Sequence, residues 1–372
     1  MSAADFRQRI EHLLAYADVA INGDRPWDLQ VNNPGLFQRV LAQGSLGFGE
    51  AYMDGWWDSE SPDQLITRLL SAGLDQQIKS LIVIYDAMKA KLLNMQSRRR
   101  AFAVGEKHYN IGNELYQQML DKRMIYSCAY WRHAADLDQA QEHKLDLTSR
   151  KLHLEKGQRV LDIGCGWGGT ARFMAERYEV EVVGVTISSE QAAFARENCA
   201  GLPVEIRLQD YRDLRGRFDR IVSIGMFEHV GYKNYRTYFK KVAELLKEDG
   251  LFLLHTIGGN IPAIRTDPWI ERYIFPNGML PSAQQIARGY EGLFILEDWH
   301  NFGPDYDRTL MAWHENFNKA WPKLQENYDE RFRRMWNYYL TSCAAAFRAR
   351  ENQLWQVVLS KKGFLGGYQF PR

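Results

Sequence analysis

A short apolar run that ends in closely spaced glycines, VLDIGCGWGG at residues 160–169, restricts the folds open to this chain. The run predicts a buried strand, and the glycines let the backbone turn tightly and approach a ligand at the start of a helix. Gly164-x-Gly166-x-x-Gly169 fits a dinucleotide fingerprint, whereas Gly164-x-Gly166-x-Gly168 fits a loop that holds S-adenosylmethionine. The first interpretation implies hydride transfer and the second implies methyl transfer.

From residue 159 onward, strand patterns alternate with helical patterns. The candidate strands are 159–164, 180–187, 204–209, 218–225, 250–258, 294–299 and 354–360, and helical patterns at 170–178, 188–200 and 233–250 lie between several of them. This alternation predicts an α/β fold with a doubly wound, Rossmann-like sheet that binds its ligand at the carboxyl ends of the strands. A helical insertion that includes 327–353 precedes the last strand, which is more usual in methyltransferase sheets than in dehydrogenases.

The first hundred residues read as helical. The patterns are a helix at 6–21, a short helix, a glycine-rich turn and an aromatic helix within 32–58, a helix within 61–74 that starts Ser-Pro-Asp, and a helix at 78–100. The last of these has an apolar face and ends in Arg98, Arg99 and Arg100. It fits a packing helix with a solvated basic face, or a helix that rests on anionic lipid headgroups. We expect a helical N-terminal domain at 1–100 and a catalytic domain at 101–372.

Composition excludes several classes of protein. Hydrophobic residues make up 45% of the 372 residues, which favours a packed core over disorder. The chain has 47 Lys and Arg and 46 Asp and Glu, and this near-neutral charge balance argues against a nucleic-acid-binding protein. The cysteines are widely spaced and form no cluster with histidine, so we expect free thiols and no metal. No apolar segment reaches the length of a membrane span and no signal peptide is evident, so we expect a cytoplasmic protein.

The ends of the second and third strands bear on the choice of cofactor. A nicotinamide-binding protein normally carries Asp or Glu about 20 residues after the glycines, to bind the ribose hydroxyls. Here the second strand ends at Thr186, which weakens the dinucleotide interpretation. The third strand ends in Gln209 and Asp210. The Asp210 carboxylate suits the exocyclic amine of an adenine ring, and it suits a helix cap equally well.

Several motifs make the chain resemble the cyclopropane fatty acid synthases. They are YSCAYW, VLDIGCGWGG, VVGVTIS, QDYRDL, SIGMFEHVG, LLHTIGG, DPWIERYIFPNGMLPS, DWHNFG and LWQVVLS, with GFGEAYMDGWWD in the helical N-terminal part. The resemblance covers nearly the whole chain, and the threonine at 186 belongs to the family's own pattern. It implies that S-adenosylmethionine is the cofactor and that the enzyme methylates double bonds of acyl chains in membrane phospholipids. Loss of a proton then closes a cyclopropane ring, in a site that excludes water.

The resemblance also implies a site. The base in this family is a bound bicarbonate, and the matching positions are Cys128, Glu228, His255, the backbone at Ile257, and Tyr306. The expected cofactor-binding residues are Tyr126, Ser127, Gly164, Gly166, Gly168, Thr186, Gln191, Gln209 and Asp210. Cys343 matches a cysteine labelled as an active-site residue, although its Ala and Phe neighbours favour an unactivated thiol. Without the resemblance, a structural role also explains both residues: Glu228 fits a carboxylate at the start of a helix, and His255 fits a histidine of the core.

The partners that the resemblance implies are phospholipids with unsaturated acyl chains, reached by transient contact with the inner face of the membrane. A homodimer stays open. Three alternatives remain: a methyltransferase of the same fold that acts on lipids or amines without ring closure, a lipid-binding protein that has lost catalysis, and a nicotinamide dehydrogenase.

Overall fold

The computed structural model describes residues 10–12, 14–74, 112–364 and 366–372. The chain divides into two compact units, each built from segments distant in the sequence. The first unit comprises Met1–Leu93, Arg265–Pro276 and Leu310–Asn352, and the second comprises Asn94–Ile264, Asn277–Thr309 and Gln353–Arg372. The expected domain boundary at residue 100 and the expected helix at 78–100 lie outside the described residues, so both stay predictions.

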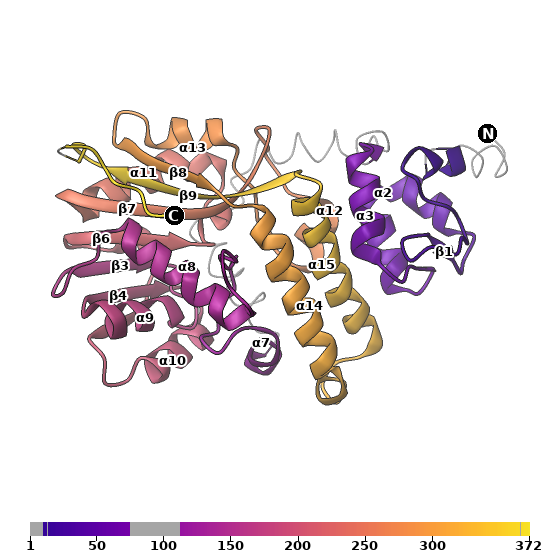
Figure 1. The fold of residues 1–372 in the computed structure, drawn as a ribbon, viewed down its shortest axis with the longest axis horizontal. Coiled ribbons are helices and arrows are strands. Elements are labelled where there is room, and N and C mark those ends of the chain that lie inside the picture. Colours follow the sequence, from indigo (N-terminus) through magenta and orange to yellow (C-terminus); the bar gives the residue numbers. More distant parts are fainter. Residues whose placement is uncertain (1–9, 13, 75–111, 365) are drawn as a thin grey trace. The chain divides into compact units, whose positions relative to one another are not determined.

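A seven-stranded sheet forms the centre of the second unit (Figure 1). Its strands are β3 (Arg159–Ile163), β4 (Glu181–Thr186), β5 (Val204–Leu208), β6 (Phe218–Ile224), β7 (Leu246–Gly259), β8 (Ile295–Asn301) and β9 (Asn352–Ser360). They follow the order β5-β4-β3-β6-β7-β9-β8, with a crossover where the order reverses beside β3. The predicted doubly wound sheet is confirmed.

The part of the sheet formed by β8 and β9 departs from the parallel arrangement. The pairs β3–β4, β3–β6, β4–β5 and β6–β7 are parallel, whereas β8 and β9 are antiparallel. The helices α14 (Pro304–Leu324) and α15 (Glu330–Arg348) connect β8 to β9. The chain therefore leaves and re-enters the sheet at the same edge, as the predicted helical insertion before the last strand requires.

The two faces of the sheet follow the alternation of side chains along each strand. On one face, Leu161 and Phe252 pack with residues of α11 (Tyr235–Leu245) and α13 (Ala283–Tyr290). On the other face, Val160 and Leu253 pack with α9 (Gly169–Tyr178) and with the residues that follow α8 (Leu137–Lys151). His255 and Gln356 have the parity of Leu253 and Val358, so their side chains lie on the α8 side of the sheet.

The remaining elements of this unit are short. They are α7 (Asn113–Met119), α10 (Ser189–Asn198), and the single turns η1 (Tyr211–Asp213), η2 (Phe227–His229) and η3 (Tyr232–Asn234). The helix expected at 233–250 is shorter than predicted, because α11 ends at Leu245 and β7 begins at once. Leu246 is fully buried and pairs with Phe218, which takes the backbone into the sheet.

The first unit is mainly helical. It contains the β1–β2 ribbon (Gln30–Val31 and Trp57–Asp58) and the helices α2 (Leu36–Met53), α3 (Pro62–Ser71) and α12 (Pro268–Tyr273), together with α15. Gly44 interrupts α2 with φ 58° and ψ −134°, which confirms the expected glycine-rich turn between two helices. Within the ranges that the structure describes, no helix is both long and apolar enough to cross a membrane.

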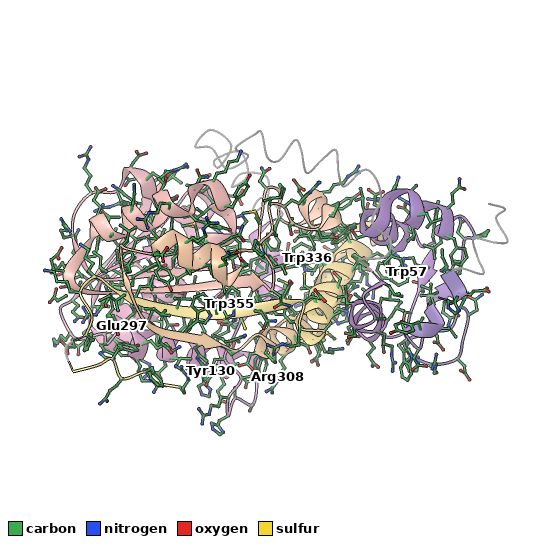
Figure 2. All side chains as sticks on the ribbon, turned by 90° about the horizontal axis from the view of Figure 1, so that it is seen from above. Trp57, Tyr130, Glu297, Arg308, Trp336 and Trp355 are labelled. Atoms are coloured by element: carbon green, nitrogen blue, oxygen red, sulfur yellow. The ribbon has the colours of Figure 1, made fainter. Side chains whose placement is uncertain are left out.

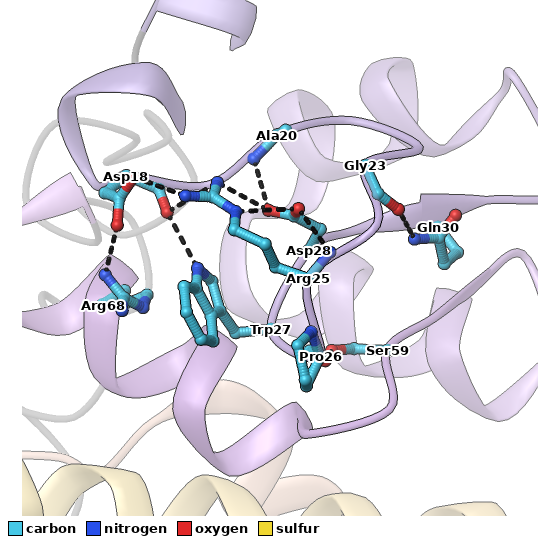
Figure 3. A network of polar contacts seen from close by, with 10 residues as sticks. All are labelled: Asp18, Ala20, Gly23, Arg25, Pro26, Trp27, Asp28, Gln30, Ser59 and Arg68. Carbon is cyan, nitrogen blue, oxygen red and sulfur yellow. Dashed lines mark hydrogen bonds and ion pairs between the residues drawn. The ribbon is translucent and has the colours of Figure 1, made fainter.

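Buried aromatic rings and an ion network hold this unit together. Trp57 stacks on Phe48 with ring centroids 4.3 Å apart, and Trp336 is fully buried on α15 (Figure 2). Near the N-terminus, the Arg25 guanidinium bridges Asp18 at 2.6 Å and the buried Asp28 at 2.9 Å (Figure 3). These contacts order a segment with little regular secondary structure.

Candidate active site

The glycine loop joins β3 to α9. Gly166 has φ 51°, and a Cβ added there would meet no protein atom within 4 Å. The other two glycines are packed instead: an added Cβ would lie 2.8 Å from the Met226 side chain at Gly164 and 3.0 Å from Cys199 Sγ at Gly168. Gly166 is therefore the position where the backbone is open to a ligand, beside the N-terminus of a helix that favours polar or anionic groups.

The end of β4 carries the next expected residues. Thr186 Oγ1 donates a hydrogen bond to Gln191 Oε1 at 3.0 Å and accepts one from Ser188 N at 3.2 Å. Gln209 N donates to Thr186 O at 3.0 Å, which joins the ends of β4 and β5. The structure thus gathers Thr186, Gln191 and Gln209 at the carboxyl edge of the sheet.

Asp210 has a structural role. Its carboxylate accepts from Arg212 N at 2.9 Å, which caps η1, and it forms a bidentate pair with the Arg212 guanidinium at 2.8 and 2.6 Å. The cap interpretation is therefore confirmed, while contact with an adenine amine stays a prediction. Asp210 is 5% exposed, so its carboxylate is largely sheltered from water.

The segment 126–128 lies between the glycine loop and α8. The Tyr126 ring is 5.2 Å from that of Tyr116, which in turn is 4.8 Å from the Trp167 ring of the glycine loop. The Ser127 hydroxyl accepts a hydrogen bond from Lys144 Nζ at 3.0 Å. Tyr126 and Ser127 are therefore linked to the predicted cofactor loop on one side and to α8 on the other.

Glu228 lies in η2, directly after β6. Its Oε1 accepts a hydrogen bond from Ile257 N at 2.7 Å, whereas its Oε2 is buried and has no hydrogen-bond partner among the described residues. Burial raises the pKa of the Glu228 carboxyl to about 7, against the opposing effect of the Ile257 N–H. Ile257 thus holds Glu228 through its backbone, and direct contact of Ile257 with an anion stays a prediction.

His255 lies on β7, two residues before Ile257. Its side chain is buried, and Gln356 Nε2 is 3.4 Å from its Nδ1. Its Nε2 is a second buried polar atom with no partner in the described part of the chain. Burial lowers the pKa of His255 well below its usual value, and the nearby positive charges of Lys144 and Lys151 lower it further. The ring is therefore neutral near pH 7.

Cys128 and Tyr306 belong to segments that pack against each other. Thr309 Oγ1 on α14 accepts from Ala129 N at 3.1 Å, and Tyr306 lies three residues earlier on the same helix. Cys128 is fully buried, and burial raises the pKa of its thiol well above the usual range. It is therefore a neutral thiol and not a nucleophile, and its contact with a ligand stays a prediction.

Cys343 lies on α15 in the first compact unit. Although the residue is partly exposed, burial of its thiol and the nearby Asp267 raise the pKa to about 12. A thiol of this kind is unactivated, as its neighbours in the sequence suggested. A chemical role for Cys343 stays a prediction.

Residues 96–357 match the family model described as mycolic acid cyclopropane synthetase. The chain belongs to this family. It is 57% identical to cyclopropane-fatty-acyl-phospholipid synthase of Escherichia coli, over 94% of this chain and 92% of that protein. A probable fatty acid methyltransferase of Pseudomonas putida is 35% identical over 92% of this chain and 89% of that one. The solved structure of cyclopropane synthase MmaA2 from Mycobacterium tuberculosis is similar with a TM-score of 0.65 and 32% identity, over 70% of this chain and 98% of that chain.

As a member of the mycolic acid cyclopropane synthetase family, the protein is an S-adenosylmethionine-dependent methyltransferase. A related mycolic acid cyclopropane synthase, CmaA1, was solved with SAH and is 33% identical, with a TM-score of 0.65 over 70% of this chain and 98% of that one. The observed site fits the cofactor: Gly166 leaves the backbone open to a ligand, and Thr186 and Gln191 are polar side chains sheltered beside it.

The site contains residues that sequence analysis missed. Along α8, buried polar residues recur every three or four positions, among buried apolar ones. These polar residues are Gln141, Lys144, Thr148 and Lys151. Gln141 Nε2 donates to the carbonyl of Ser127 at 2.8 Å, Lys144 Nζ donates to the hydroxyl of the same residue, and Lys151 Nζ pairs with Asp298 at 2.9 Å. Nothing but the helical spacing of these polar residues signals their burial in the sequence.

Proposed function

We propose that the protein transfers the methyl group of S-adenosylmethionine to the double bond of an unsaturated acyl chain in a membrane phospholipid, and then closes a cyclopropane ring. The alkene electrons form the new bond to the methyl carbon as the bond to the sulfonium breaks, which leaves a carbocation on the acyl chain and neutral S-adenosylhomocysteine. Loss of a proton from the new methyl group then closes the ring. The similarity to the Escherichia coli synthase over nearly the whole chain supports this reaction.

The observation that carries the proposal is a pair of buried polar atoms without partners. Glu228 follows the end of β6, and His255 lies on β7 paired with Ile224, the last residue of β6; no described residue bonds to Glu228 Oε2 or to His255 Nε2. Buried polar atoms in proteins nearly always have a hydrogen-bond partner. Two such atoms without a partner at this edge of the sheet are therefore suited to bind a polar ligand. Bound bicarbonate would supply the base that accepts the proton.

The protein's own residues would have three tasks in this scheme. Glu228, held by the Ile257 N–H, and His255, buried on β7, would bind and orient the base. The buried thiol of Cys128 and the phenol of Tyr306 would contact it from the neighbouring segments. The surrounding apolar and aromatic side chains would exclude water, which otherwise traps the carbocation.

The protein would reach its substrate by docking on the inner face of the membrane. We propose that the helix expected at 78–100, which lies outside the described residues, supplies the contact through its apolar face and its three terminal arginines. Basic residues close to an anionic surface attract it by about 1 kcal/mol each.

The reaction is tested with phospholipid vesicles and methyl-labelled S-adenosylmethionine. Label should enter the acyl chains of vesicles that contain unsaturated lipid and should be absent from vesicles of saturated lipid. Added bicarbonate should raise the rate when the buffer has been depleted of it. Label found on headgroup amines would instead support the alternative of a methyltransferase of the same fold, and it would refute ring closure.

A further inference from the structure

Three buried side chains form a continuous hydrogen-bonded chain behind His255. Thr148 on α8 and Gln356 on β9 are both fully buried. Thr148 Oγ1 lies 2.8 Å from Lys144 O, Gln356 Nε2 lies 3.1 Å from Thr148 Oγ1, and the same nitrogen lies 3.4 Å from His255 Nδ1. The Gln356 Oε1 atom has no hydrogen-bond partner among the described residues, so the chain runs through Nε2, and its direction can be worked out atom by atom.

The hydroxyl of Thr148 fixes the first step. Two oxygens 2.8 Å apart need a hydrogen between them, and the Lys144 carbonyl has none to give. The single hydroxyl hydrogen of Thr148 therefore points at Lys144 O. Thr148 Oγ1 can then only accept from Gln356, which requires the nitrogen of the amide, and not its oxygen, to face the hydroxyl.

The amide of Gln356 fixes the second step. One of its two hydrogens goes to Thr148, and the other points along the 3.4 Å contact to His255 Nδ1. An amide nitrogen does not accept hydrogen bonds, so Nδ1 must carry a lone pair. A neutral imidazole with a lone pair on Nδ1 carries its proton on Nε2. This is the buried His255 nitrogen for which no described residue supplies a partner.

We infer that Thr148 and Gln356 are positioning residues that keep the proton of a neutral His255 on Nε2, so that the ring offers a donor, and not a base, to the reaction site. The inference rests on the proposed function only for the identity of the group that accepts this hydrogen bond. The positive charges of two buried lysines of α8, Lys144 and Lys151, disfavour a second proton on the ring. A donor at this place suits an anionic oxygen, and it leaves deprotonation of the substrate to another group.

The tautomer of His255 is measurable by NMR of nitrogen-labelled histidine, with the His255 signals assigned by their loss in His255→Ala. We expect Nε2 to be protonated and Nδ1 to be bare in the full-length parent protein. Protonation of Nδ1 in the parent would overturn the inference, whether or not the protein forms cyclopropane rings. A missing response to bicarbonate would count against the proposed base only, because the tautomer is read without substrate.

Gln356→Glu tests the role of the amide. A carboxylate at this position can only accept, so we expect Nδ1 to become protonated and turnover to fall about 10- to 100-fold, the range found for groups that orient a histidine ligand. Gln353→Glu is the matched control: Gln353 is also buried on β9, but it bonds to Asn260 and Asn301. We expect its His255 signals to equal those of the parent.

Thr148→Val gives a second variant should Gln356→Glu fail to fold. It removes the hydroxyl and leaves a side chain of similar shape, so the amide of Gln356 is free to turn over. Part of the His255 population should then carry its proton on Nδ1. A His255 spectrum that is unchanged in both folded variants would contradict the inference.

Discussion

Gly166 is the residue of the glycine loop at which the backbone is open to a ligand. Its φ of 51° is strained for any residue with a Cβ, and the space beside it is open. We expect Gly166→Val to fold with a modest loss of stability and to lose most of its affinity for S-adenosylmethionine, since the branched side chain enters the open space. Calorimetry measures this directly. An affinity equal to that of the parent in a folded variant would remove the glycine loop from the cofactor site.

Glu228 and His255 should serve deprotonation more than cofactor binding. Glu228→Gln and His255→Ala are expected to lose turnover while their affinity for S-adenosylmethionine stays within about tenfold of the parent. The reason is that Glu228 follows β6 and His255 lies on β7, whereas the glycine loop follows β3. Glu248→Gln, which changes an exposed carboxylate paired with lysines, is the control. Parental turnover in either site variant would show that the base site lies elsewhere.

At the scale of the element, α8 places polar and charged side chains in the interior of the protein, next to the site. Burial lowers the pKa of Lys144 to about 8, and it raises that of Asp162 on β3 to about 7. Lys144 and Asp162 nevertheless stabilise each other's charged forms, which opposes both shifts. Burying these groups costs free energy, and the contacts that α8 makes in return are with Ser127 and Gln356.

The buried pair of Lys151 and Asp298 gives a stability test of this element. Asp298 also binds the Arg372 guanidinium at 2.6 and 2.8 Å, so it keeps a partner when Lys151 is replaced. We expect Asp298→Asn to lower the free energy of unfolding by about 3–5 kcal/mol, because it leaves the buried ammonium without a carboxylate partner, and Lys151→Met to cost clearly less.

Denaturant titration separates the two cases. Arg150→Met, on the exposed side of the same helix, is the control and should change stability by less than about 1 kcal/mol. If Asp298→Asn and Lys151→Met lower the free energy of unfolding equally, the stabilising role assigned to the Arg372 contact is wrong.

The alternation of strands and helices was predictable from the sequence because apolar strand residues and glycines are local signals. The strands β3 and β9 and the break at Gly44 all follow from such patterns. The buried polar residues of α8 did not, because they include Gln141 and Lys144, which a hydrophobic pattern assigns to solvent. The start of β7 at Leu246 depends on pairing with a distant strand, so no local pattern marks it.

At the scale of the whole molecule, the proposed substrate lies within a bilayer, so the proposal requires the protein to meet it at the membrane surface. Replacing Arg98, Arg99 and Arg100 together by Ser should weaken binding to anionic vesicles and raise the lipid concentration needed for turnover, with cofactor affinity unchanged. The effect should shrink as salt screens the charges. A flotation assay checks this, and equal binding of parent and triple variant at low salt would place docking on another surface.

The central claim is ring closure, and the fate of the methyl hydrogens tests it most directly. With S-adenosylmethionine labelled by three deuterium atoms on the methyl group, mass analysis of the acyl chains shows how many of them the product keeps. We predict that two of the three remain, since the base removes one as the ring closes. Retention of all three, in a saturated methyl branch, would contradict the account.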